Sequence, residues 1–154
     1  MTRDRSRRRW SWIPTPHQGN GTAEVVDAWP WAHLLDFYEE DIYPWPKAKE
    51  EFAVPMGQGT SDGEYLEILR DHLPGVLDRV RPSLVIYNAG SDVLASDPLT
   101  RLALTVEGMV DRDLYVVTTS AREKRAGRDA PLGWVRFAIL GSSRAIHRSD
   151  FDAV

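Results

Sequence analysis

Residues 82–92 read PSLVIYNAGSD, and this stretch decides the fold class. Its four consecutive apolar residues, Leu84 to Tyr87, are typical of a strand that is covered on both faces, as in a parallel sheet. A helical pattern precedes the stretch and a second one follows it. Because helix, buried strand, loop and helix in this order form the pattern of α/β folds, we predict a parallel sheet flanked by helices.

The other elements are predicted from apolar periodicity and from proline and glycine. The helix before the strand has a good cap and an amphipathic pattern, and it is expected to break or restart at Pro74. Helices are expected over 19–29, 61–81 and 106–124, a strand over 31–39, and irregular structure over the proline- and glycine-rich segment 41–60.

The composition excludes several classes of protein. At 154 residues the chain is long enough for one domain with a core. It has no cysteine, which excludes disulfides, thiolate zinc sites and cysteine nucleophiles. No apolar run approaches the length of a membrane span, and the start MTRDRSRRR lacks the apolar stretch of a signal peptide. A cytoplasmic protein without a membrane partner is expected.

The net charge of −4 hides an acidic body between two arginine-rich ends. Residues 13–120 carry 18 acidic and 7 basic residues, whereas residues 1–12 have a net charge of +4 and residues 121–154 of +3. Arginine-rich ends are typical of disordered tails or of tails that bind nucleic acid. Nucleic-acid binding by the tails is therefore one alternative function.

The stretch 15–21, TPHQGNG, poses a chemical question. Metal sites in α/β proteins often take two ligands as D-x-H at a strand end, because alternate residues face the same side. His17 is present here, but the position of the aspartate holds Thr15. A histidine in a glycine-rich loop is by itself more often structural than a metal ligand, so further motifs are needed to decide.

Two further motifs follow HQGNGT along the chain. The segments HQGNGT (17–22), GTSDGEYL (59–66) and YNAGSDVLASDPL (87–99), followed by LALT, occur in this order. Together they resemble the histone deacetylase family, specifically the class IV and bacterial branch of the arginase–deacetylase fold. The resemblance covers about residues 17–120 and corresponds to the C-terminal half of the family domain. It implies a partial three-layer α/β/α sandwich with a parallel sheet.

The resemblance also implies site residues. His17 and Asp92 match two zinc ligands of the family, and Thr15 stands at the position of the third. We therefore expect the His17 and Asp92 side chains to lie side by side at the carboxyl edge of the sheet, although Thr15 cannot complete the metal shell. Asp92 taken alone is equally suited to a turn or a helix cap. Three glycines match the scaffold of the site: Gly19, Gly21 and Gly90.

The implied activity is zinc-dependent hydrolysis of an acetyl-amide bond, in acetyl-lysine protein, acetylpolyamine or another acylated small amine. A catalytic zinc needs three protein ligands and an open position. This chain lacks one ligand, the family's histidine pair and its catalytic tyrosine, where Arg144 stands. No catalytic residue is retained, so we expect an inactive chain, and a non-catalytic remnant or binding module is the alternative.

Codon arithmetic offers an origin for these losses. Read one base out of step, the possible codons of RWSWIPTP (9–16) permit VVVDPDA, which restores D-x-H before HQGNGT. The same shift of RAGRDAPLGWV (125–135) permits VPVVMLPSGGY, which restores the family's closing tyrosine motif. We therefore predict an out-of-frame or disordered segment over 1–16, a partial deacetylase-like domain over 17–120, and an out-of-frame or disordered tail over 121–154.

Overall fold

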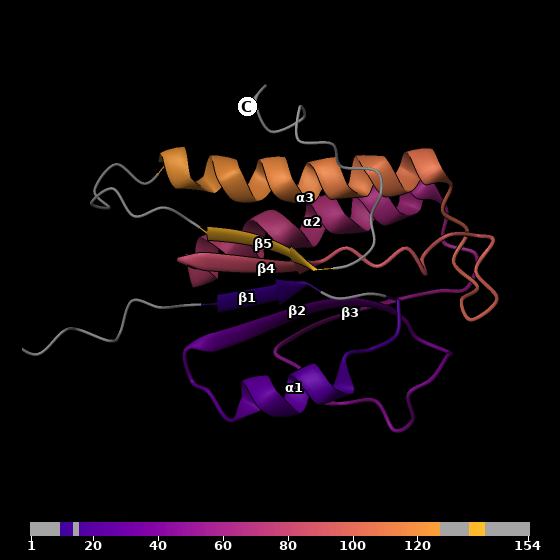
Figure 1. Ribbon diagram of the computed structural model, residues 1–154, viewed down its shortest axis with the longest axis horizontal. Coiled ribbons are helices and arrows are strands. Elements are labelled where there is room, and N and C mark those ends of the chain that lie inside the picture. The colour runs from indigo at the N-terminus through magenta and orange to yellow at the C-terminus, as the bar shows by residue number, and fades with distance from the viewer. Residues whose placement is uncertain (1–9, 14–15, 127–135, 141–154) are drawn as a thin grey trace, which may run out of the picture.

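Five parallel strands form one sheet in the computed structural model, which describes residues 10–13, 16–126 and 136–140 (Figure 1). The order across the sheet is β3-β2-β1-β4-β5, and every neighbouring pair is parallel. The α/β class and the parallel sheet predicted from the sequence are thereby confirmed. The strands are β1 (Trp10–Ile13), β2 (Ala32–Glu39), β3 (Phe52–Met56), β4 (Leu84–Asn88) and β5 (Arg136–Leu140).

Helices lie on both sides of this sheet (Figure 1). Helices α2 (Asp62–Val80) and α3 (Val106–Ala126) pack side by side on one face, and α1 (Asn20–Asp27) lies on the other. The arrangement has three layers, as predicted. Among the described residues, no helix has the length and apolar character that a membrane crossing requires.

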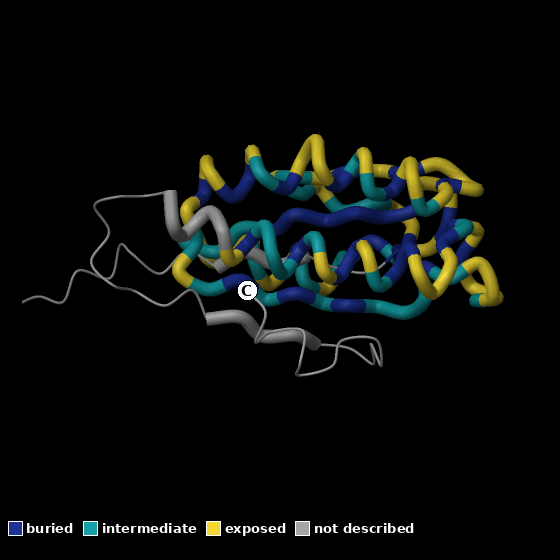
Figure 2. Tube along the Cα trace, turned by 90° about the horizontal axis from the view of Figure 1, so that it is seen from above, coloured by how far each residue is buried: buried dark blue, intermediate teal, exposed yellow. Residues whose placement is uncertain are grey.

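The main core lies between the sheet and the helix pair α2 and α3. Leu35 and Phe37 of β2, Leu69 of α2, Val85 of β4 and Val116 of α3 are all buried in one cluster. Figure 2 shows exposed residues on the outer sides of the helices and buried residues along the strands between them. This core fixes the positions of β2 and β4, whose carboxyl ends border the site.

Strand β4 differs from its prediction in one respect. Val85 and Tyr87 are buried, but Leu84 and Ile86 are only partly so. The reason is that α1 packs against β2 and lies away from β4 (Figure 1). The expected burial on both faces applies instead to β2, whose last six residues are all buried.

Two predicted boundaries were wrong. Strand β3 lies inside the segment expected to be irregular, and it tolerates Pro55 because an edge strand needs hydrogen bonds on one side only. Helix α2 continues through Pro74 without a break. Leu73 and Leu77, on either side of this proline, are buried in the same core, and this packing stabilises the helix across the missing backbone bond.

The predicted end segments contribute two strands to the sheet. Trp10–Ile13 forms β1 and pairs with β2 on one side and β4 on the other, and Arg136–Leu140 forms β5 at the edge. Residues 121–126 of the predicted tail form the end of α3, and Pro16 is also described. The other parts of both end segments, with Thr15 and Arg144, lie outside the described residues. The central strand of the sheet is thus a stretch for which the sequence predicts disorder or an altered reading frame.

Candidate functional site

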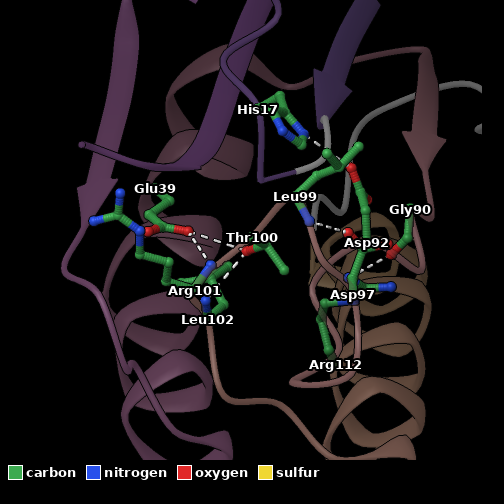
Figure 3. Close-up of polar contacts among 10 residues, drawn as sticks. All are labelled: His17, Glu39, Gly90, Asp92, Asp97, Leu99, Thr100, Arg101, Leu102 and Arg112. Atoms are coloured by element: carbon green, nitrogen blue, oxygen red, sulfur yellow. Dashed lines mark hydrogen bonds and ion pairs between the residues drawn. The ribbon is translucent and has the colours of Figure 1, made fainter. Parts of the chain in front are cut away.

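The candidate site lies where β1 and β4 end (Figure 3). These strands are parallel neighbours, so the loops after them emerge at the same edge of the sheet. His17 belongs to the first loop and Asp92 to the second. The His17 Nδ1 and Asp92 Oδ2 atoms lie 3.2 Å apart, although the two residues are 75 positions apart in the chain. The predicted proximity of these two side chains is confirmed.

The distance suits two neighbouring ligands of one zinc ion. Two bonds of about 2.0 Å at a tetrahedral angle place the ligand atoms about 3.3 Å apart. Asp92 Oδ1 is buried and accepts no hydrogen bond from the described residues, so a second carboxylate oxygen remains available. Without a metal, the same geometry is a direct imidazole–carboxylate contact. Both side chains are about one quarter exposed, at 25% and 28%.

The donor set around this pair is incomplete in the part of the chain that the structure describes. No cluster of three or more histidine, aspartate or glutamate side chains suited to a metal occurs among the described residues. The third ligand position of the family, Thr15, lies outside them. The residues that fit a zinc ion are therefore one imidazole and one carboxylate.

The loop that carries His17 is fixed by backbone and amide contacts. The Gly19 N–H donates to Asp36 Oδ2 at 2.9 Å, and the Glu39 N–H donates to the Pro16 carbonyl at 2.8 Å. A Cβ atom at Gly19 would make only ordinary contacts, the nearest at 3.5 Å, and one at Gly21 would meet nothing within 4 Å. Close approach of the backbone is therefore not what either glycine provides in this structure.

The loop that carries Asp92 is anchored by a buried ion pair. Arg112 of α3 donates from Nη1 to the Gly90 carbonyl at 3.0 Å, and its guanidinium contacts Asp113 at 2.8 Å. The Tyr87 hydroxyl donates to the same carboxylate. Burial raises the pKa of Tyr87 well above its ordinary value, so its hydroxyl keeps the proton that it donates. Gly90, predicted as scaffold, thus acts through its carbonyl.

Glu39, at the end of β2, contacts the chain near both loops (Figure 3). Its Oε2 accepts hydrogen bonds from Thr100 Oγ1 at 3.0 Å and from the Arg101 N–H at 2.7 Å. The backbone N–H of Glu39 donates to the Pro16 carbonyl, as described above. Glu39 therefore joins the segment before His17 to the segment that follows Asp92. Asp97 forms the expected turn, since its carboxylate accepts the Leu99 N–H at 2.8 Å.

Sequence reasoning missed Glu39 and Arg112 as parts of the site. A weak signal existed for both: Glu39 ends the apolar run of a predicted strand, and Arg112 shares a helix face with Met109 and Val116 at the i−3 and i+4 positions. Such residues are rarely buried unless they are paired. The partners of Glu39 lie 61 and 62 residues away in the sequence, and Gly90 lies 22 residues from Arg112. The sequence alone therefore does not identify these partners.

Comparison with known proteins identifies relatives of this arrangement. The family described as Histone deacetylase domain matches residues 16–126, which is more than half of the chain. An uncharacterized protein of Picosynechococcus sp. is 35% identical over 103 residues, covering 67% of this chain and 34% of the relative. Histone deacetylase 2 of Arabidopsis thaliana is 38% identical over 111 residues, covering 70% of this chain and 28% of the relative. The chain thus spans about a third of the length of these relatives.

A solved structure shows the same fold. The acetylpolyamine aminohydrolase from Burkholderia pseudomallei superposes with a TM-score of 0.66 at 21% sequence identity. The match covers 90% of this chain and 40% of that protein. At this identity the likeness concerns the fold, and it agrees with the arginase–deacetylase architecture that the motifs imply.

Proposed function

Because this chain belongs to the histone deacetylase domain family, we propose that His17 and Asp92 form the zinc half-site of a deacetylase-type hydrolase. The observation that supports this most directly is the 3.2 Å separation of their ligand atoms, which suits two adjacent zinc ligands. The buried, unpartnered Asp92 Oδ1 adds a free oxygen at the same place. The fold-level likeness to an acetylpolyamine aminohydrolase agrees with this family of reactions.

A zinc ion held at such a site would supply Lewis-acid activation of the amide carbonyl and of water. The residues of this chain would hold the ion, with Glu39 and Arg112 fixing the two loops that present the ligands. The substrate class is an acetyl-lysine protein or an acetylated small amine, in line with the printed names of the relatives.

We further propose that the chain does not turn over substrate as it stands. Two ligands hold zinc weakly, and Arg144 stands where the family motif has its catalytic tyrosine. Loss of one oxyanion donor alone typically lowers the rate about 100- to 1,000-fold. The missing groups at Thr15 and Arg144 lie in the stretches that we propose are out of frame. Sequencing of the gene across both stretches tests that origin, and intact reading frames throughout would refute it.

Zinc binding and hydrolysis test the proposal separately. Calorimetric titration of the purified chain is expected to show weak binding of one zinc ion, which is lost in His17→Ala and in Asp92→Ala. His33→Ala is the matched control, because His33 lies 2.7 Å from Glu51 and is a second place where a metal could bind. Unchanged binding in His17→Ala would refute the half-site. An assay with an acetylated peptide and an acetylated polyamine is expected to show no turnover above background, and measurable turnover would refute inactivity.

Nucleic-acid binding through the arginine-rich ends is the competing function. Residues 13–120, which make up most of the described part of the chain, are strongly acidic and do not favour it. A DNA titration at several salt concentrations distinguishes the two, because phosphate contacts weaken steeply with salt. Tight, salt-sensitive binding would favour the competing function.

A further inference from the structure

The loop that carries His17 is fastened to the segment that follows β2. The Gln18 side chain exchanges two hydrogen bonds with the backbone of Ala48, at 2.9 and 2.8 Å. Asn20 Nδ2 donates to the Pro46 carbonyl at 3.0 Å. Two acidic side chains meet at this junction, Asp36 from β2 and Glu50 from the end of the segment. Their charge state therefore bears on how the loop is held.

Three carboxylate oxygens of this pair lack an ordinary donor. Asp36 is fully buried, and its Oδ2 accepts the Gly19 N–H at 2.9 Å. Asp36 Oδ1 and both carboxylate oxygens of Glu50 are also buried, and no described residue donates to them in good geometry. The two carboxyl groups lie near enough for each to shift the pKa of the other. A hydrogen bond between them requires a proton on one of the two.

The electrostatics favour one proton on Asp36. Burial raises the pKa of Asp36 to about 8, the Gly19 N–H lowers it, and the negative charge of Glu50 raises it again. Burial also raises the pKa of Glu50, the less buried of the two. Lys47 is the nearby cation and lowers both pKa values, but its ammonium donates to the Ile42 carbonyl at 2.8 Å. Two adjacent buried carboxylates do not both ionise readily.

We propose that Asp36 and Glu50 share one proton, and that this acid pair is the positioning device that fastens the His17 loop to the segment after β2. Asp36 accepts the Gly19 N–H through one oxygen and donates its proton to Glu50 through the other. The pair thereby connects the backbone two residues after His17 to β2 and to residue 50. This role requires no metal and is independent of the proposed zinc half-site.

The pair makes stability depend on pH. Between the ordinary pKa of an aspartate and about 8, the folded chain holds a proton that the unfolded chain has released. Stability is therefore highest on the acid side of this window and falls as the pH rises through it. Above pH 8 the folded and the unfolded chain have both released the proton. The ionised Asp36 and Glu50 carboxylates then repel each other.

Asp36→Asn is the decisive variant. The asparagine oxygen can accept the Gly19 N–H while its amide donates to Glu50, so the variant imitates the protonated pair at every pH. Between pH 5 and pH 8.5, the midpoint of thermal unfolding is expected to fall further in the unaltered chain than in Asp36→Asn, by about 5 °C or more. Asp71→Asn, at an exposed position on α2, is the matched control and should follow the unaltered chain at every pH.

Two NMR measurements test the mechanism itself. The side-chain carboxyl carbon of Asp36 is expected to titrate near pH 8, and Glu50→Gln should move that titration toward the ordinary aspartate range. The Gly19 amide is expected to keep its protection from hydrogen exchange in Asp36→Asn and to lose it in Asp36→Leu. If Asp36→Leu does not fold, Glu50→Gln alone carries the test. An Asp36 titration near pH 4, or parallel pH curves for the unaltered chain and Asp36→Asn, would overturn the proposal.

Discussion

Strands β1 and β4 are parallel neighbours, and the loops after them carry His17 and Asp92, yet the sequences of the two strands differ in kind. β4 reads LVIYN and continues into the family motif with Asp92, whereas β1 reads WSWI and leads through Thr15 to His17. Both pair fully along their lengths. Strands as different as WSWI and LVIYN pair equally well because backbone pairing uses main-chain groups, whereas a metal site would require particular side chains.

The largest effect is expected where the loop after β4 is anchored. Arg112→Met removes the cation from Asp113 and leaves that carboxylate buried without its charge partner. Breaking such a pair typically costs about 3–5 kcal/mol, and the Gly90 carbonyl also loses its donor. Chemical denaturation measures the loss. Lys49→Met, which removes a cation from an exposed position, is the matched control and should change stability by about 0.5 kcal/mol or less. Equal effects of the two changes would contradict the anchoring role.

A proline in each strand tests whether β1 is as necessary as β4. Ser11→Pro and Ile86→Pro each remove a backbone donor from an inner strand that is paired on both sides. Each is expected to lower the free energy of unfolding by about 3 kcal/mol or more. Pro55 shows that the edge strand β3 tolerates the same residue. If Ser11→Pro left stability unchanged while Ile86→Pro did not, β1 would not be the central strand in solution.

Glu39→Ala tests the connection between the two loops. The change leaves Thr100 Oγ1 and the Arg101 N–H without their buried acceptor. A loss of about 1–3 kcal/mol is expected from unsatisfied buried donors. Glu39→Gln keeps an acceptor oxygen and should restore most of it. Denaturation of both variants gives the comparison, and an Ala variant as stable as the Gln variant would count against the connection.

The sequence predicts those elements whose causes are local. Helix α2 starts where Ser61 and Glu64 form a capping box. The helix continues through Pro74 because the packing of its apolar residues outweighs the loss of one backbone hydrogen bond. β3 escapes prediction because its tolerance of Pro55 depends on its place at the sheet edge. That place is a property of the assembled sheet and is not encoded in the segment alone.

The candidate site likewise has a part that the sequence predicts and a part that it does not. His17 and Asp92 could be predicted as neighbours because the family resemblance matches both of them to ligands of one zinc ion. The roles of Glu39, Arg112 and Asp36 could not, because each depends on burial and on contacts with distant parts of the chain. A charged residue in an apolar pattern indicates a buried partner but does not name it.

The central claim is that this chain keeps the positions of the ligands and lacks one ligand. Thr15→Asp restores the D-x-H spacing and is expected to raise zinc affinity. Mutation of a group that only hydrogen-bonds to a metal ligand typically changes metal affinity about 10- to 100-fold. A residue that binds the metal directly should change the affinity at least as much. Thr15→Asn, similar in shape but neutral, is the matched control. Calorimetric zinc titration of both variants beside the unaltered chain is the most direct measurement. The account predicts tighter binding for Thr15→Asp alone, and equal affinities in all three proteins would contradict it.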